Sequence, residues 1–331
     1  MSASTPSSRL RVAAAQIAPV WLDRAATLAK IERAVHDAAD AGAQLVCFGE
    51  TILPGYPFWL ELTDGARFNS AIQKEIHAHY VDQAVRIVAA ADGGGDLASL
   101  CALAARRRIA IYVGVLERDG GRIGGRSGHS VYCSLVYIGA DGVIGSIHRK
   151  LMPTYEERLT WAQGDGHGLR THALGAFTVG GLNCWENWMP LARAALYGQG
   201  EDLHVAVWPG NVRNTIDLTR HIARESRSFV ISVSGLMRRE DIPASTPQAE
   251  RILAACPPMP ADGGTCIAGP DGEWLAAPVA GIETIVYADL DPARVREERQ
   301  NFDAAGHYSR PDVTQLIVNR ERQSPTRFIG D

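Results

Sequence analysis

The stretch around Cys184 is the part of this sequence best suited to nucleophilic chemistry. An apolar segment over residues 176–180 predicts a short strand, and the pattern over 191–197 predicts a helix. Cys184 therefore lies where a strand turns into a helix. Because the free backbone N–H groups at a helix start carry a partial positive charge, this position favours a thiolate and an oxyanion beside it. The alternative interpretation is a buried small hydrophobic residue, as most free cysteines are.

A carboxylate and an ammonium group stand in comparable positions. The apolar segment 44–48 predicts a strand that ends just before Glu50, and another predicted strand runs into Lys150. Taken singly, each could be an ordinary solvated side chain. If the strands lie parallel in a pair of sheets, these two groups and Cys184 converge at one edge. A cysteine nucleophile needs a base, which a buried Glu50 can supply, and Lys150 beside the Trp185 backbone N–H can stabilise a tetrahedral intermediate.

The order of apolar and amphipathic segments predicts an α/β protein. Strands alternate with helices in the first and third quarters and hairpins intervene, which indicates two mixed sheets covered by helices rather than one parallel sheet. Residues 242–263 are Pro-rich and are expected to form an irregular surface excursion. The predicted strands are 11–18, 44–48, 109–116, 131–138, 143–148, 176–180, 203–208, 229–234, 265–268, 274–277 and 282–290; the predicted helices are one capped by Asp23 and ending near Gly42, then 69–90, 97–108, 191–197, 215–227 and 292–300.

Composition narrows the class of protein. The chain has 331 residues, 46% of them hydrophobic and 21% charged, and a formal net charge of −4, which is ordinary for a soluble globular protein with a large core. No basic face is evident, so nucleic acid is not expected as a partner. Residues 1–10 are polar, are expected to be disordered and lack the apolar run of a signal peptide; no stretch is long enough to span a membrane. The six scattered cysteines show no CxxC pair, which favours reduced thiols in the cytoplasm.

Several motifs together resemble the carbon–nitrogen hydrolase (nitrilase) superfamily, and more closely its nitrilase branch. The resemblance covers about residues 10 to 310 and is specific only when the motifs are combined. Weaker agreement extends over 204–209, 221–230, 263–264 and 269–272. The strongest motifs are Phe48-Gly49-Glu50-Thr51 with Pro54-Gly55-Tyr56-Pro57, then His148-Arg149-Lys150-Leu151-Met152-Pro153-Thr154 with Glu157, Arg158 and Trp161, and Asn183-Cys184-Trp185-Glu186-Asn187 with Met189-Pro190-Leu191.

The resemblance implies a fold and a set of roles. The implied fold is an α-β-β-α sandwich of four layers. The implied catalytic residues are Glu50 as base, Lys150 as stabiliser of the intermediate, Cys184 as nucleophile, and Glu157, which orients the others and the attacking water. Four further residues match positions that line the nitrile pocket in relatives, although core packing is an equal interpretation for the aromatic ones: Tyr56, Trp161, Trp185 and Pro209.

The resemblance also implies a reaction and an assembly. The expected reaction is hydrolysis of a nitrile to a carboxylic acid and ammonia through a thioimidate and a thioester on Cys184, without metal or organic cofactor; early release of the thiol would give an amide. The expected small-molecule partner is the nitrile. Residues 11–300 are expected to form the hydrolase domain, and 301–331 a tail that acts as an assembly arm in a homodimer or larger spiral homo-oligomer.

Two other functions stay open at this point. The first is an amidase or carbamoyl hydrolase of the same superfamily. Trp185 directly after the cysteine favours the nitrilase branch, whereas residues 235–239 depart from the run expected of the best-known nitrilases. The second is a non-catalytic binding or assembly protein, against which the intact Glu50, Lys150, Glu157 and Cys184 argue.

Overall fold

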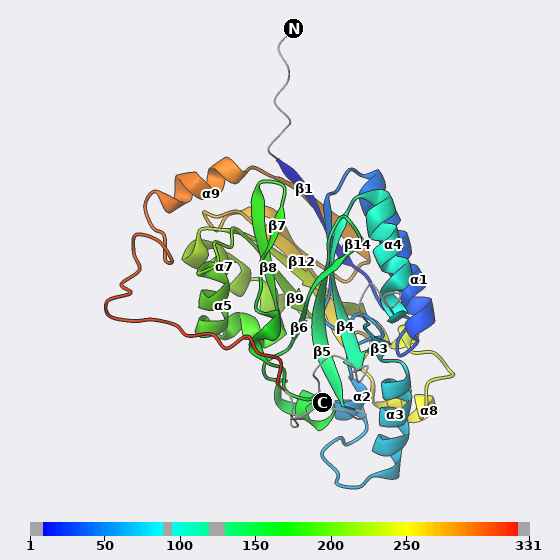
Figure 1. Cartoon of the computed structure of the whole chain (residues 1–331). Helices are drawn as coiled ribbons and strands as arrows, with labels where there is room; N and C mark the ends of the chain where they lie inside the picture. Colours follow the sequence, from blue (N-terminus) through cyan, green and yellow to red (C-terminus); the bar gives the residue numbers. More distant parts are fainter. Residues whose placement is uncertain (1–8, 89–94, 119–129, 324–331) are drawn as a thin grey trace, which may run out of the picture.

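Two mixed β-sheets pack face to face in the computed structural model, which describes residues 9–88, 95–118 and 130–323 (Figure 1). The first sheet has the order β14-β1-β2-β4-β5-β6, with β3 beside β4. Strand β2 runs parallel to β4, and two antiparallel steps from β4 bring β6 back to the same direction, so β2 and β6 end at the same edge. The strands are β1 (Leu10–Gln16), β2 (Leu45–Phe48), β3 (Val85–Arg86), β4 (Ala110–Arg118), β5 (Val131–Ile138), β6 (Ile144–Arg149) and β14 (Thr284–Leu290).

The second sheet has the order β11-β12-β10-β9-β8-β7, with β13 beside β12. Its centre is parallel, since β8, β9 and β10 run in one direction, and β7 and β12 flank them antiparallel. The strands are β7 (His172–Leu174), β8 (Phe177–Asn183), β9 (Leu203–Trp208), β10 (Phe229–Ser234), β11 (Leu236–Met237), β12 (Ala261–Ala268) and β13 (Trp274–Ala280).

Helices cover the outer faces of both sheets (Figure 1). α1 (Arg24–Asp40) and α4 (Ala98–Arg107) lie on the first sheet, and α5 (Pro190–Tyr197) and α7 (Leu218–Ser226) on the second. The remaining helices are α2 (Trp59–Leu62), α3 (Ala71–Asp82), α6 (Val212–Thr215), α8 (Ala249–Ala255) and α9 (Pro292–Arg299), with 3₁₀ turns η2 (Gly95–Leu97), η3 (Tyr155–Leu159), η4 (Gly166–Gly168), η5 (Cys184–Trp188) and η6 (Arg239–Asp241).

Alternate side chains of the central strands explain the layers. In β1, Ala13 and Ala15 pack under α1 and α4, whereas Val12 and Ala14 point into the space between the sheets. Because both faces are buried, the strand is apolar over residues 12–15 instead of alternating with polar residues. The predicted α-β-β-α sandwich is therefore confirmed.

The helix predicted over residues 69–90 is too long. α3 ends at Asp82, and Val85 then pairs with Glu117 of β4 as part of β3. Val85 is fully buried there and Ile87 nearly so, which shows that tertiary pairing outweighs the local helical pattern at this end.

Residues 242–263 are more ordered than the predicted surface excursion. They contain α8 and the first residues of β12, and Ile252 of α8 is fully buried in a cluster with Trp59 and Leu60 of α2. The helix predicted over 215–227 corresponds to α7, whereas the short α6 that precedes it and the three-residue β7 were not predicted.

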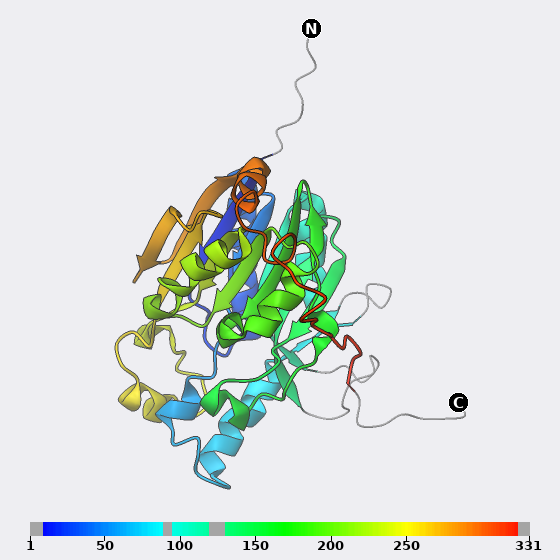
Figure 2. The same ribbon diagram turned by 90° about the vertical axis from the view of Figure 1, so that its left-hand side faces the viewer.

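Some predictions fall outside the described residues. These are residues 1–8 of the start that is expected to be disordered, residues 89–90 at the end of the predicted helix 69–90, and residues 324–331 of the tail. Residues 301–323 run along the outer side of α7 and α5 (Figures 1 and 2). None of the described helices combines the length and apolar character needed to cross a bilayer.

Candidate active site

Cys184 lies in a strained turn at the end of β8. The strand ends at Asn183, Cys184 adopts a left-handed φ of +45°, and η5 follows. Such a φ is uncommon for a residue with a Cβ, and it persists only where the surroundings hold it. The side chain is 4% exposed, and the adjacent Trp185 backbone N–H favours its thiolate form. The predicted position between strand and helix is thus confirmed, with η5 lying between the strand and α5.

Glu186 ties this turn to the end of β6. Its carboxylate is fully buried and accepts hydrogen bonds from the Asn183 N–H at 2.8 Å, the Leu151 N–H at 2.6 Å and His148 Nε2 at 3.0 Å. Burial alone would raise the pKa of Glu186, but His148 and the two backbone N–H groups lower it. Since Leu151 directly follows Lys150, the same carboxylate sets the positions of the thiol and the ammonium group.

Asn187 holds the turn from the other side. Its Nδ2 donates to the carbonyl oxygens of Cys184 at 2.8 Å and Leu182 at 3.3 Å. Its Oδ1 lies 2.8 Å from Nε2 of His204, which in turn lies 2.9 Å from Glu201. All of these polar side chains are fully buried, so hydrogen bonds within the protein, and not hydrogen bonds to solvent, stabilise the turn.

Glu50 is placed by a tight backbone crossing after β2. A Cβ at Gly114 would collide with the backbone of Gly49 and Thr51, so only glycine lets β4 pass this close. The Glu50 N–H donates to the Trp208 carbonyl at 3.1 Å, and Thr51 has a φ of +46°. The loop is therefore held between the two sheets, and the Glu50 carboxylate points to the interior, 2% exposed.

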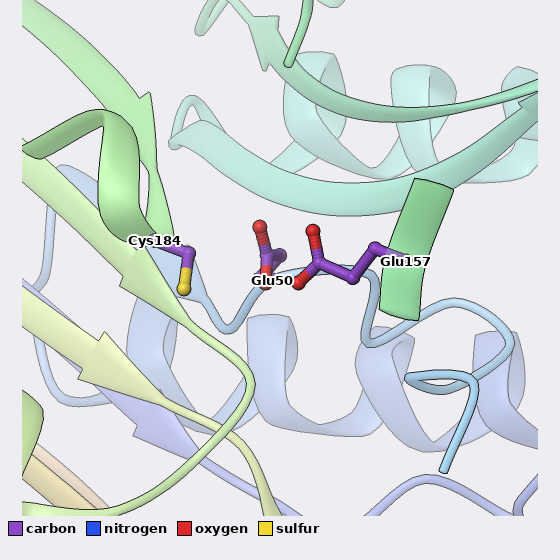
Figure 3. A group of neighbouring side chains, drawn as sticks. All are labelled: Glu50, Glu157 and Cys184. Atoms are coloured by element: carbon purple, nitrogen blue, oxygen red, sulfur yellow. The ribbon is translucent and has the colours of Figure 1, made fainter. Parts of the chain in front are cut away.

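Lys150 forms ion pairs with two carboxylates, one of which is Glu50. Its Nζ lies 2.9 Å from Glu50 Oε1 and 2.7 Å from Glu157 Oε2. Glu157 lies in η3, where it also accepts the Thr154 N–H at 2.6 Å. Glu50, Glu157 and the Cys184 sulfur converge from three separate segments, with their acceptor atoms within 4.8 Å of one another (Figure 3).

Burial and mutual contact shift the pKa values of this group. Burial, followed by the charge of Glu157, raises the pKa of Glu50 to about 7 although Lys150 opposes it. Burial and the two carboxylates raise the pKa of Cys184 well above its usual value, against Lys150 and the Trp185 N–H. Burial opposes a charge on Lys150, yet Glu50, Cys184 and Glu157 raise its pKa. The cluster thus contains an ammonium ion, a neutral thiol and a carboxylate whose pKa is near neutrality.

The two carboxylates and the thiol, Glu50, Glu157 and Cys184, are side chains of the kinds that bind metal ions. Lys150, however, already contacts both carboxylates, so the chain itself supplies a positive charge where a cation would bind. The arrangement is suited to thiol attack on an electrophilic carbon, with a base beside the sulfur.

Comparison with known proteins places this chain in a family. The model of the carbon–nitrogen hydrolase family matches residues 11–300. The chain is 37% identical to a protein named aliphatic nitrilase from Sinorhizobium fredii, over 96% of this chain and 98% of that protein. It is 33% identical to a bifunctional nitrilase/nitrile hydratase of Nicotiana tabacum, over 99% of this chain and 91% of that one. The chain belongs to the carbon–nitrogen hydrolase family.

Solved structures of carbon–nitrogen hydrolases and amidases share the fold of this chain. A carbon–nitrogen hydrolase from Helicobacter pylori has a TM-score of 0.64 at 18% identity, covering 93% of this chain and 100% of that one. An amidase from Nesterenkonia sp. AN1, solved with acrylamide, has a TM-score of 0.59 at 17% identity, covering 91% and 98%.

The four residues expected to line a pocket in this hydrolase lie in different surroundings. Tyr56 donates from its hydroxyl to Glu157 Oε1 at 2.7 Å, and with Pro209 it lines a cavity of about 190 Å³. Trp161 is buried, with its ring 5.4 Å from Lys150 Nζ and edge-on to Tyr56. Trp185 is 53% exposed. The structure thus groups Tyr56 and Trp161 around the ion cluster, Pro209 at the cavity, and Trp185 at the surface.

Two residues that contact the site were missed by the sequence reasoning. Glu186 stands three residues after Asn183, the spacing of a capping box, which could have identified it. Cys133 lies on β5, its carbonyl accepting the Lys150 N–H at 2.8 Å, and pairing the predicted strands 131–138 and 143–148 could have placed it near Lys150.

Proposed function

We propose that this protein hydrolyses organic nitriles to the carboxylic acid and ammonia through covalent intermediates on Cys184. The observation that carries the proposal is the buried cluster of Glu50, Lys150 and Glu157 within reach of the Cys184 sulfur. The choice of nitriles rests on relatives of near full-length coverage that are named nitrilases. Trp185 after the nucleophile, already noted in the sequence, agrees with that choice.

The first half of the reaction forms a thioimidate. The Cys184 sulfur adds to the nitrile carbon while its proton moves to Glu50. Glu50 then passes this proton to the nitrile nitrogen, leaving a carbon bonded to sulfur and doubly bonded to N–H, and the carboxylate is free again. The developing negative charge is stabilised by Lys150 and by the Trp185 backbone N–H. Both groups already lie beside the sulfur, so no reorganisation is needed during the step.

The second half uses two water molecules. The first adds to the thioimidate carbon with Glu50 as base; Glu50 carries the protons of this water to the nitrogen, and ammonia leaves, which produces a thioester. The second cleaves the thioester to the carboxylic acid and restores the thiol. Glu157 contacts Lys150 and Tyr56, so it holds the ammonium group and is placed to orient water. If the carbon–sulfur bond breaks before ammonia leaves, the product is the amide.

A panel of matched nitriles and amides tests the proposal. Ammonia, acid and amide are quantified for aliphatic, aromatic and arylacetonitrile substrates beside the corresponding amides. Faster turnover of nitriles than of amides supports the proposal, whereas faster turnover of amides indicates an amidase. The Cys184→Ala variant should form no acid and no adduct by intact mass. A wild-type protein with neither turnover nor adduct would instead be a non-catalytic member of the family.

We also propose an assembly for this enzyme. Residues 11–300 would act as the hydrolase domain and 301–331 as an assembly arm of a homodimer or larger spiral homo-oligomer in the cytoplasm. The exposed apolar side chains of Trp188, Leu191 and Ile317 support this, because such groups favour burial between subunits. Light scattering coupled to size exclusion tests it, and a monomer at micromolar concentration would contradict it.

A further inference from the structure

A second buried thiol contacts the proposed base. Cys133 of β5 is 1% exposed, and its sulfur lies 3.4 Å from Glu50 Oε1. Thr51, the residue after Glu50, places its hydroxyl 3.3 Å from the same sulfur. The mechanism above gives Cys133 no part, yet its side chain lies between two neighbouring residues of the Glu50 loop.

The two oxygens of the Glu50 carboxylate have different surroundings. Oε1 is contacted by both Lys150 Nζ at 2.9 Å and the Cys133 thiol. Oε2 is buried and accepts no hydrogen bond from any part of the chain that the structure describes. A buried acceptor without a partner is costly, and such an atom in an active site is suited to taking up a proton.

The hydroxyl of Thr51 determines how the Cys133 thiol is used. A hydroxyl is a better donor than a thiol, so Thr51 donates to the sulfur, which leaves the S–H directed at Glu50 Oε1. The backbone of Cys133 is fixed separately, because its carbonyl accepts the Lys150 N–H in the pairing of β5 with β6. Changing the side chain therefore leaves the position of Lys150 in place.

We propose that Cys133 is a positioning residue that anchors Oε1 of Glu50, reserves Oε2 for the Cys184 proton, and sets how readily Glu50 accepts that proton. The proposal rests on the proposed function, in which Glu50 is the base. Donation of a hydrogen bond to a carboxylate stabilises its charged form, so a stronger donor at position 133 makes Glu50 a weaker base and removal of the donor makes it a stronger one.

The other groups that face Glu50 stay constant in this comparison. They are Lys150 at the end of β6, Glu157 in η3, Cys184 after β8, Tyr56 of the loop before α2, and Tyr80 of α3. What changes between a thiol, a hydroxyl and a methyl group is the pair of hydrogen bonds made by side chain 133, to Glu50 Oε1 and from Thr51. A merely structural role for Cys133 would lower stability without moving a pH profile in opposite directions.

The experiment compares Cys133→Ser and Cys133→Ala with the wild type. The pH dependence of kcat/KM is measured on the best nitrile, and the rate of Cys184 alkylation by iodoacetamide is measured on the same proteins by peptide mass. We expect the acid limb to move to lower pH in Cys133→Ser and to higher pH in Cys133→Ala, by about half a pH unit or more each way. Cys266→Ala, a buried thiol of the other sheet, should leave the profile in place.

The proposal is overturned if both variants keep the wild-type acid limb, or if both shift it in the same direction. If Cys133→Ala fails to fold, the direction of the shift in Cys133→Ser decides alone. Failure of the proposed function is a separate result, because it appears as absent nitrile and amide turnover in the wild type. The alkylation profile still reports proton transfer from Cys184 in that case, so the role of Cys133 is tested either way.

Discussion

Replacing Glu186 by glutamine tests whether one buried carboxylate sets the geometry of the whole site. Oε1 accepts the Leu151 N–H at 2.6 Å and Oε2 accepts the Asn183 N–H at 2.8 Å, while His148 Nε2 lies 3.0 to 3.1 Å from both oxygens. Glutamine has one oxygen and one NH₂ group. In either orientation, therefore, the NH₂ group faces a backbone N–H that was satisfied before.

The expected losses of stability and of kcat in Glu186→Gln follow from these contacts. An unsatisfied buried donor costs about 1–3 kcal/mol, and loss of the charge weakens the remaining bonds by about 1 kcal/mol more. For 331 residues, a total near 3 kcal/mol should lower the melting temperature by roughly 4 °C. The opposed N–H and NH₂ groups should also separate the Cys184 turn from Lys150. A displacement of about 1 Å near the chemistry can cost on the order of 100-fold in rate, so kcat should fall by about 10- to 100-fold.

The melting temperature is measured first, and kcat and KM are then measured at a temperature where the variant is folded. Glu273→Gln is the matched control, since Glu273 forms ion pairs with the partly exposed Arg220 and Arg224, and its substitution should change stability by less than about 0.5 kcal/mol. A Glu186→Gln protein with the melting temperature and kcat of the wild type would refute the reasoning. A lower melting temperature with unchanged kcat would show that Glu186 supports the fold without positioning the site.

Three further outcomes are expected. Because the base acts as a carboxylate and the pKa of Glu50 is raised to about 7, chiefly by burial, kcat/KM should fall about tenfold per pH unit below that value; a profile level down to pH 5 would contradict it. Cys184→Ala should keep the circular dichroism of the wild type and lose all acid formation, and residual turnover would exclude the thiol mechanism. Arg322→Ala removes the 2.9 Å ion pair with buried Asp165 and should make residues 316–323 more susceptible to limited proteolysis, whereas unchanged cleavage would show that the pair does not hold the tail.

Much of the fold is predictable because it is set by local chemistry. Asp23 and Asp291 cap α1 and α9 with their side chains, as their positions before helical patterns predict. The turn between β5 and β6 is identifiable from Gly142, which has a left-handed φ of +81°. The central strands are apolar on both faces, which predicts burial between two layers.

Other features depend on contacts that no local pattern reveals. α3 ends where it does because Val85, just after it, pairs with β4. α8 forms because its Ile252 packs against α2. Irregular pairing between Tyr137 and Ile138 shifts the register of the β5–β6 hairpin. That register brings Cys133 beside Lys150, so the contact of this thiol with Glu50 was visible only in three dimensions.

The pKa shifts of the cluster indicate when the proton of Cys184 moves. Burial and the nearby carboxylates keep the resting sulfur protonated, and they also bring the pKa of Glu50 up to about 7. Complete transfer before attack would place a thiolate beside the Glu157 carboxylate, where Lys150 already pairs with both carboxylates. Transfer during attack avoids this, because the negative charge passes on to the nitrile nitrogen as the carbon–sulfur bond forms. The raised pKa of Glu50 then matters more than a lowered pKa of the thiol would. It allows the carboxylate to accept the proton within the bond-forming step and to pass it to the nitrile nitrogen, which frees the carboxylate to act as base on water.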